Sequence, residues 1–124
     1  MKTSSCKAKG RILQQLVAKA LAEVYDLSYG PDQDVGSREM GQSGTDVKLS
    51  PLARTKIAYN VECKNGKSIG LWGSWAQTIA NTGDGRVPLL VMKRNRQEPL
   101  AILTFEHLIT LLKKQKMNEK VKTK

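Results

Sequence analysis

Cysteine, histidine and aromatic residues are scarce in this sequence of 124 residues, and the scarcity argues against several classes of protein. The two cysteines, Cys6 and Cys63, are too few for a disulfide framework and lack the spacing of zinc ligands. The single histidine, His107, lies in an apolar helical stretch, which argues against histidine–aspartate triads and multi-histidine metal sites. We therefore expect a reduced protein of the cytoplasm, or of the host cytoplasm if the source is viral.

Long hydrophobic runs are also missing from the chain. No segment approaches the roughly 18 apolar residues of a membrane span, so we expect no membrane partner. The first ten residues, MKTSSCKAKG, lack the apolar core of a secretory signal. Residues 1–22 are basic and free of acids, as in some organelle transit peptides, but the same residues also make a good core helix.

Acidic residues are outnumbered, because 11 Asp and Glu face 21 Lys and Arg and leave a formal net charge of +10. Such an excess usually indicates a polyanionic partner, most often nucleic acid. Residues 113–124 hold six lysines and one glutamate, which is half of the excess. Terminal lysine runs are often disordered, so charge alone supports nucleic-acid binding only weakly. We expect one domain over residues 1–112, followed by this basic tail.

The pattern of apolar residues predicts a mixed β-sheet flanked by helices, an α/β fold. Helices are predicted over residues 8–26, 69–80 and about 105–112, with Ser68 and Thr104 as candidate caps. Strands are predicted over residues 45–50, 56–64, 86–94 and 100–105. The glycine-rich loop over residues 28–46 has room for a short strand, and residues 51–56 are expected to turn the chain.

The segment NVECKNGK (residues 60–67) places an acid and a base on one side of a predicted strand. Because side chains alternate along a strand, Glu62 and Lys64 share a face while Cys63 points to the core. Asp46 begins the preceding strand and can lie beside Glu62 if the two strands are neighbours. Adjacent carboxylates repel, and a divalent cation such as Mg²⁺ would relieve the repulsion. Taken alone, an acid and a lysine two positions apart are more often an ordinary solvated strand face.

The sequence SGTDVKLS (residues 43–50), followed by VECK (residues 61–64), resembles the D-(x)n-E-x-K signature of the PD-(D/E)XK nuclease superfamily. Within it, the chain is most similar to small phage and archaeal Holliday junction resolvases, over most of residues 8–112. Thr45 stands where the name of the superfamily has proline. The resemblance implies a restriction-endonuclease-like core with the element order α-β-β-β-α-β.

The resemblance also implies a nuclease that hydrolyses DNA phosphodiesters with Mg²⁺, for which Mn²⁺ would substitute, and that leaves a 5′-phosphate. Asp46 and Glu62 would bind the metal ion, with the Cys63 backbone carbonyl as a further ligand. Lys64 would be the catalytic lysine. Relatives use an upstream glutamate as well, and two residues stand as alternatives for it, Glu39 in the loop before Asp46, which we prefer, and Glu23 on the first helix.

Several residues are candidates for contacts with DNA. Ser43 and Gly44 match a mobile loop that approaches DNA in relatives, although a plain turn explains them equally well. Gln77 takes the position of a glutamine near the active site, and is otherwise a helix-surface residue. Trp72 and Trp75 could stack on unpaired bases, but are more often core or dimer-interface residues at this spacing. Candidate phosphate contacts are Lys67, Arg38, Arg54, Lys93, Arg94 and Arg96.

We therefore expect an Mg²⁺-dependent endonuclease that acts on branched DNA such as a four-way junction. Symmetric cutting needs two active sites, so a two-fold homodimer is expected, with its interface on the Trp72 helix or the last helix. Three alternatives stay open: another structure-specific, nicking or repair endonuclease of the same fold, a non-catalytic nucleic-acid-binding domain, and an accessory subunit anchored by its lysine tail.

Overall fold

The computed structural model describes residues 3–38, 45–66 and 70–122, with side chains over 8–38, 45–66 and 70–120. Its elements, in chain order, are α1 (Thr3–Tyr25), β1 (Val35–Ser37), β2 (Val47–Leu49), α2 (Pro51–Lys56), β3 (Tyr59–Asn65), α3 (Leu71–Asn81), β4 (Val87–Lys93), β5 (Leu100–Ile102) and α4 (Phe105–Lys122). None of the helices in these ranges is both long enough and apolar enough to cross a membrane.

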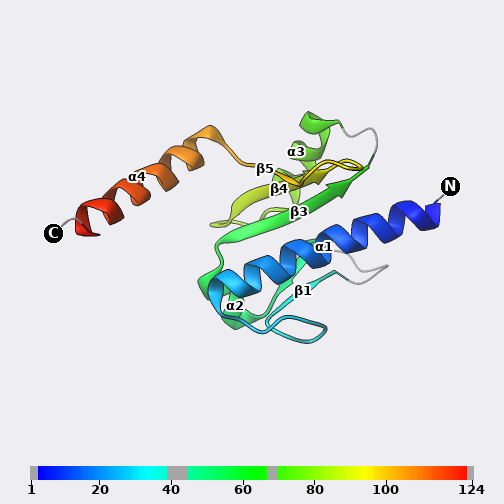
Figure 1. The fold of residues 1–124 in the computed structure, drawn as a ribbon, viewed down its shortest axis with the longest axis horizontal. Coiled ribbons are helices and arrows are strands. Elements are labelled where there is room, and N and C mark those ends of the chain that lie inside the picture. The colour runs from blue at the N-terminus through cyan, green and yellow to red at the C-terminus, as the bar shows by residue number, and fades with distance from the viewer. Residues whose placement is uncertain (1–2, 39–44, 67–69, 123–124) are drawn as a thin grey trace.

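The strands form two small sheets, and the single central sheet that the sequence predicts is not seen (Figure 1). β1 and β2 pair in antiparallel fashion. β3 pairs in parallel with β4 along its whole length, and β4 pairs in antiparallel fashion with β5. The fold is therefore of the mixed α/β class, as predicted, whereas a restriction-endonuclease-like core stays a prediction.

The separation of the two sheets has a local cause at the edge of β3 that does not face β4. There the backbone N–H of Cys63 donates to Oδ2 of Asp46, at 2.7 Å, just before β2 begins. Strands join one sheet only where the backbone groups of one bond to those of the other. At this position a side chain and not the backbone of the hairpin takes the donor, and β2 lies beside β3 without forming a ladder with it.

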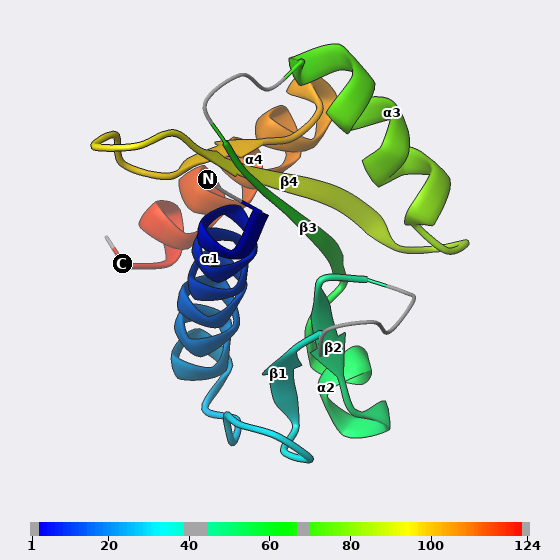
Figure 2. The same ribbon diagram turned by 90° about the vertical axis from the view of Figure 1, so that its right-hand side faces the viewer.

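The two longer helices near β3, α1 and α3, cover its opposite faces (Figure 2). On one face Val61 and Cys63 pack with buried α1 residues, chiefly Leu13 and Val17, in the hydrophobic core. Glu62 points to the other face, toward α3, and only 3% of it is exposed. The polar face of β3, expected to be an ordinary solvated surface if it had no special role, is therefore buried.

Most predicted elements are present with shifted ends. The strand expected in the glycine-rich loop is β1, and Thr104 caps α4, because the N–H of His107 donates to its Oγ1 at 3.1 Å. Residues 51–56, predicted as a turn, form the short helix α2. Its cap is Ser50, whose Oγ accepts from the N–H of Ala53. The predicted cap Ser68 lies outside the described residues, and Gly70 occupies the cap position of α3 without a side-chain bond.

Helix α4 projects from the body as an arm (Figure 1). Its first turn is held by a hydrogen bond between the Tyr59 hydroxyl and Nε2 of His107, at 2.6 Å, with the two rings edge to face. From Thr110 to Lys120 every side chain is exposed. The basic residues expected to form a tail thus continue the helix as far as Lys122.

Candidate metal and catalytic site

Asp46 lies at the loop end of the β1–β2 hairpin, directly before β2. The backbone N–H of Arg38 donates to the Asp46 carbonyl at 2.8 Å, which continues the antiparallel register by one pair beyond Ser37 and Val47. Residues directly opposite each other in such a pair send their side chains to the same face. Accordingly, Nη2 of Arg38 lies 3.1 Å from Oδ1 of Asp46, in an ion pair that holds the buried carboxylate in place.

Asp46 also connects the hairpin to β3. Its Oδ2 accepts the Cys63 N–H, so the two oxygens of one carboxylate bind Arg38 and the backbone of β3. Backbone N–H and C=O groups of one strand residue point to the same edge. The carbonyl of Cys63, predicted as a metal ligand, is therefore expected to open toward Asp46.

Glu62 is the second buried acid of the site. Among the residues that the structure describes, its Oε2 is buried and has no hydrogen-bond partner. An acceptor left unpaired in the interior costs about 1–3 kcal/mol of folding free energy, and more if it is charged, so this atom destabilises the folded state. An unpartnered buried carboxylate oxygen is the donor atom that a hard divalent cation would take up.

Burial raises the pKa of Glu62 from 4.5 to about 7, and the neighbouring Asp46 carboxylate adds to the rise. A hydrogen bond from the Asn81 side chain and the positive charges of Arg38 and Lys64 act in the opposite direction. The charge of Asp46 acts on Glu62, and Oδ2 of Asp46 bonds to the backbone of Cys63, the residue after Glu62, so the two buried acids lie in one region of the protein. That the two carboxylates share one metal ion stays a prediction.

Lys64 lies on the same face of β3 as Glu62, two residues further on, and is half-buried. Its charge acts on Glu62, so the amine and the two acids belong to one electrostatic cluster. Cys63 between them has a different position, because its side chain is in the hydrophobic core. Burial raises the pKa of the Cys63 thiol, with contributions from Asp46 and Glu62, so the thiol stays protonated and only its backbone is suited to a metal site.

The fit of a metal ion follows from these donors. Asp46 and Glu62 supply carboxylate oxygens and the Cys63 carbonyl a third oxygen, which is the chemistry that Mg²⁺ and Mn²⁺ prefer. Within the described ranges, no three side chains of His, Cys, Asp or Glu are grouped to hold an ion. A third side-chain ligand would have to come from elsewhere, and Glu39, the preferred candidate, lies outside the described residues.

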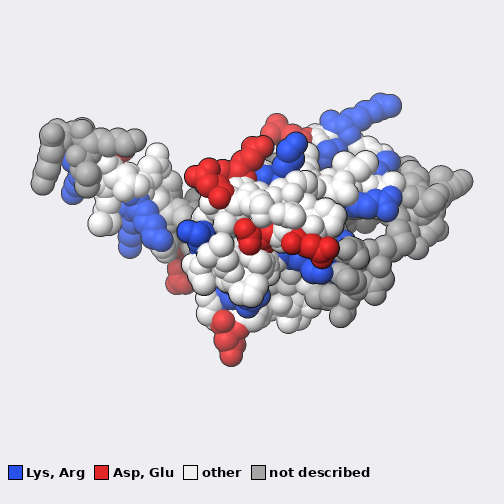
Figure 3. Space-filling model, turned by 90° about the horizontal axis from the view of Figure 1, so that it is seen from below, with Lys and Arg blue, Asp and Glu red and all other residues white. Residues whose placement is uncertain are grey.

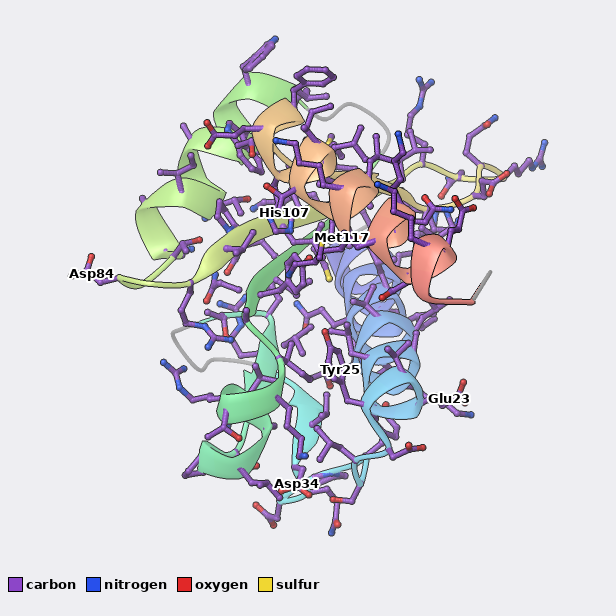
Figure 4. All side chains as sticks on the ribbon, turned by 90° about the vertical axis from the view of Figure 1, so that its left-hand side faces the viewer. Glu23, Tyr25, Asp34, Asp84, His107 and Met117 are labelled. Carbon is purple, nitrogen blue, oxygen red and sulfur yellow. The ribbon has the colours of Figure 1, made fainter. Side chains whose placement is uncertain are left out.

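The alternative upstream acid, Glu23, is exposed on the outer side of α1 and points away from the body (Figure 4). Its position gives no support to a metal-binding role. Three of the predicted DNA contacts, Ser43, Gly44 and Lys67, fall outside the described residues. Gln77 is exposed on α3, where it could meet a ligand or solvent.

The tryptophans and the basic candidates have different surroundings. Trp72 is 79% exposed near the start of α3, so the core role is wrong for it, while Trp75 is half-buried. Arg54 is exposed on α2. Arg38 is not simply a solvent-facing residue, because it forms an ion pair with Asp46. Figure 3 shows further Lys and Arg side chains along the projecting α4 arm.

Two residues of the site were not foreseen in their roles. Arg38 was predicted as a phosphate contact, and its ion pair with Asp46 was not predicted. The register of β1 and β2, which places Arg38 opposite Asp46, is the signal that could have indicated this ion pair. Asn81 hydrogen-bonds to Glu62 from the last turn of α3, and no signal in the sequence marks it. No protein-family model matches the chain, and no curated protein or solved structure matches it either.

Proposed function

We propose that this protein is a divalent-metal-dependent endonuclease that hydrolyses phosphodiester bonds of branched DNA, as Holliday junction resolvases do. The observation that carries the proposal is the burial of two acids, Asp46 and Glu62, whose charges act on each other, with Lys64 on the same strand face as Glu62. A fold that only displays charge to solvent does not bury two repelling carboxylates together, one of them with an unpartnered oxygen.

The roles follow from the positions of the groups. Asp46, Glu62 and the carbonyl of Cys63 would hold Mg²⁺, or Mn²⁺ in its place, which supplies Lewis-acid activation of a phosphate oxygen and a lowered pKa of bound water. Lys64 would stabilise the negative charge that develops on the phosphate. Water adds to phosphorus, the bond from phosphorus to the 3′ oxygen breaks, and the products are a 5′-phosphate and a 3′-hydroxyl.

Arg38 would act as a switchable partner of Asp46. In the protein without metal its guanidinium offsets the charge of the buried carboxylate. About a third of the Arg38 side chain is exposed, so it has room to turn outward when a cation takes over this role. A neighbouring phosphate of the DNA is the natural new partner for a displaced guanidinium.

The proposal is tested by incubating a labelled four-way junction with the protein in Mg²⁺ and in EDTA, beside duplex, flap and single-stranded DNA. We expect cleavage of the junction only with the metal. Asp46→Asn, Glu62→Gln and Lys64→Gln should each lower the rate by about a hundredfold or more, while junction binding persists. Lys56→Gln, on exposed α2, is the control and should cut normally. Full activity of the Asp46 variant, or cleavage in EDTA, would sink the mechanism.

The same ion pair favours a second candidate, a nucleic-acid-binding domain without catalysis. If Arg38 satisfies Asp46 permanently, the acids are structural and no metal enters. This reading predicts junction binding without strand scission in Mg²⁺ or Mn²⁺. Preference for flap or duplex over the junction would instead identify a related endonuclease of another specificity.

A further inference from the structure

A hollow of about 360 Å³ lies between α1 and the ends of β3 and β4, apart from the acidic site. Asn65, the last residue of β3 and the residue after Lys64, belongs to the lining of the hollow. Because side chains alternate along a strand, Asn65 lies on the α1 side of the sheet and Lys64 on the other. The hollow and the acidic site therefore open on opposite faces of one strand end.

The lining of the hollow is cationic. Lys9 of α1, Lys93 at the end of β4 and Arg96 in the following turn all belong to it, and no carboxylate of a described residue does. The two lysines bond to neutral oxygens: Nζ of Lys9 donates to Oδ1 of Asn95, and Nζ of Lys93 donates to the Arg94 carbonyl. Three positive charges without a counter-charge in the lining favour an anionic ligand.

One wall of the hollow is apolar. Ile12 and Leu16, one turn apart on α1, are 61% and 50% exposed and face this space, whereas their neighbour Leu13 is buried. Asn65, in the same lining, is held to α1, because its Nδ2 donates to the Lys9 carbonyl at 3.3 Å. The lining thus offers an apolar contact beside its three cations.

We propose that this hollow binds a nucleotide. A phosphate matches the three cations, and the apolar face of a base matches the wall of Ile12 and Leu16. The ligand is either free or an unpaired nucleotide of a DNA strand. The second source rests on the proposed function, because branched DNA contains unpaired nucleotides and can pass around the end of β3 from the acidic site to the hollow.

A second copy of this chain suits the hollow less well. One uncovered helix that another copy would offer is the projecting arm α4, and its outer half carries Lys113, Lys114 and Lys116. Bringing these lysines to a lining that is already cationic would be repulsive.

The test uses methyl-labelled protein in EDTA, so that cleavage plays no part. Titration with 2′-deoxyadenosine 5′-monophosphate should shift the Ile12 and Leu16 methyl signals, and bind more tightly than either inorganic phosphate or deoxyadenosine. Ile12→Ser should weaken nucleotide binding about fivefold but leave phosphate binding unchanged. Val24→Ser, at another exposed residue of α1 that lies outside the hollow, should change neither. Arg96→Gln should weaken both anions about fivefold, and Arg94→Gln, outside the lining, neither.

The source of the nucleotide is decided by two duplexes, one with a single unpaired nucleotide and one fully paired. If the bulged duplex shifts the signals and the free nucleotide does not, the hollow binds an unpaired nucleotide of a DNA strand. If the free nucleotide also shifts them, the hollow binds a mononucleotide as well. The proposal is overturned if neither ligand moves these signals, if phosphate binds as well as the nucleotide, or if the shifts follow protein concentration alone. None of these outcomes depends on cleavage, so a failure here is distinct from a failure of the nuclease.

Discussion

At the scale of single residues, the unusual group is Glu62, a buried acid whose pKa is raised to about 7 by burial and by Asp46. An acid of this kind binds a proton more tightly in the folded chain than in the unfolded chain. Its contribution to stability is therefore fully present below its ordinary pKa of 4.5 and is lost as the pH rises through about 7.

We predict that Glu62→Gln removes this pH dependence. In EDTA the unfolding free energy of both proteins is compared at pH 4.5 and pH 8. Between these pH values the wild-type protein should lose about 3 kcal/mol more than the variant does. Urea unfolding at the two pH values measures the difference, with Glu23→Gln, at an exposed glutamate, as the control that should follow wild type. Equal slopes for wild type and Glu62→Gln would show that the carboxylate is not buried as described.

Asp46 gives a second prediction, because it accepts the N–H of Cys63. Asp46→Asn keeps a side-chain oxygen at this position, whereas Asp46→Ala leaves a buried backbone donor unpaired. The alanine variant should be less stable than the asparagine variant by about 1–3 kcal/mol. Chemical denaturation in EDTA compares the two, and identical midpoints would mean that the side chain does not join the hairpin to β3.

At the scale of elements, periodicity was sufficient to predict α1, α3 and the strands β2 to β5, since each has apolar residues at its own spacing. Helix α2 was missed although Ser50 and Pro51 are ordinary signals of a helix start. The division of the strands into two sheets could not be predicted, because periodicity does not show which strands pair, and here a side chain of Asp46 rather than a backbone group meets the N–H of Cys63. The order of Asp46, Glu62 and Lys64 along the chain could be predicted from the sequence. The burial of the Glu62 face of β3 by α3 could not.

The apolar pattern of α1 also overstated its contact with the core. Leu13 and Val17 are buried as expected of such a stripe, but Ile12, Leu16 and Val24 on its flank are exposed. Periodicity shows that one side of a helix is apolar, and cannot show how much of that side the neighbouring strands are wide enough to cover.

The projecting helix α4 carries the third prediction. Its lysines are exposed as far as the side chains are described, up to Lys120, and its first turn is tied to the body through Tyr59 and His107. Ending the chain after Leu112 removes six lysines and should leave the unfolding free energy within about 0.5 kcal/mol of the full chain. If about half of these lysines meet phosphates, the slope of log K against log salt for junction binding should become shallower by about 3. An unchanged slope would mean that the arm does not touch DNA.

At the scale of the whole molecule, net charge and exposed apolar surface point to different partners. The charge of +10 favours DNA, whereas large apolar side chains left uncovered on α3 and α4 favour a protein contact. The proposed cutting of a four-way junction unites the two, since a two-fold dimer presents two acidic sites to one DNA.

We predict a homodimer by sedimentation equilibrium, with its interface on one of these helices. Trp72→Glu tests α3 and Leu112→Glu tests α4, and one of the two should convert the protein to a monomer. Val24→Glu, at an equally exposed residue of α1, is the control and should stay dimeric. A wild-type protein that is monomeric at all concentrations would contradict the predicted dimer. It would not contradict the proposed metal site within one chain.

The central claim is that Asp46 and Glu62 share one divalent cation, and binding of Mn²⁺ followed by electron paramagnetic resonance tests it most directly. The wild-type protein at pH 8 should bind one Mn²⁺ at this site, in competition with Mg²⁺, and Asp46→Asn and Glu62→Gln should each weaken binding at least about tenfold. Wild-type affinity in both variants would show that the two acids hold no metal ion.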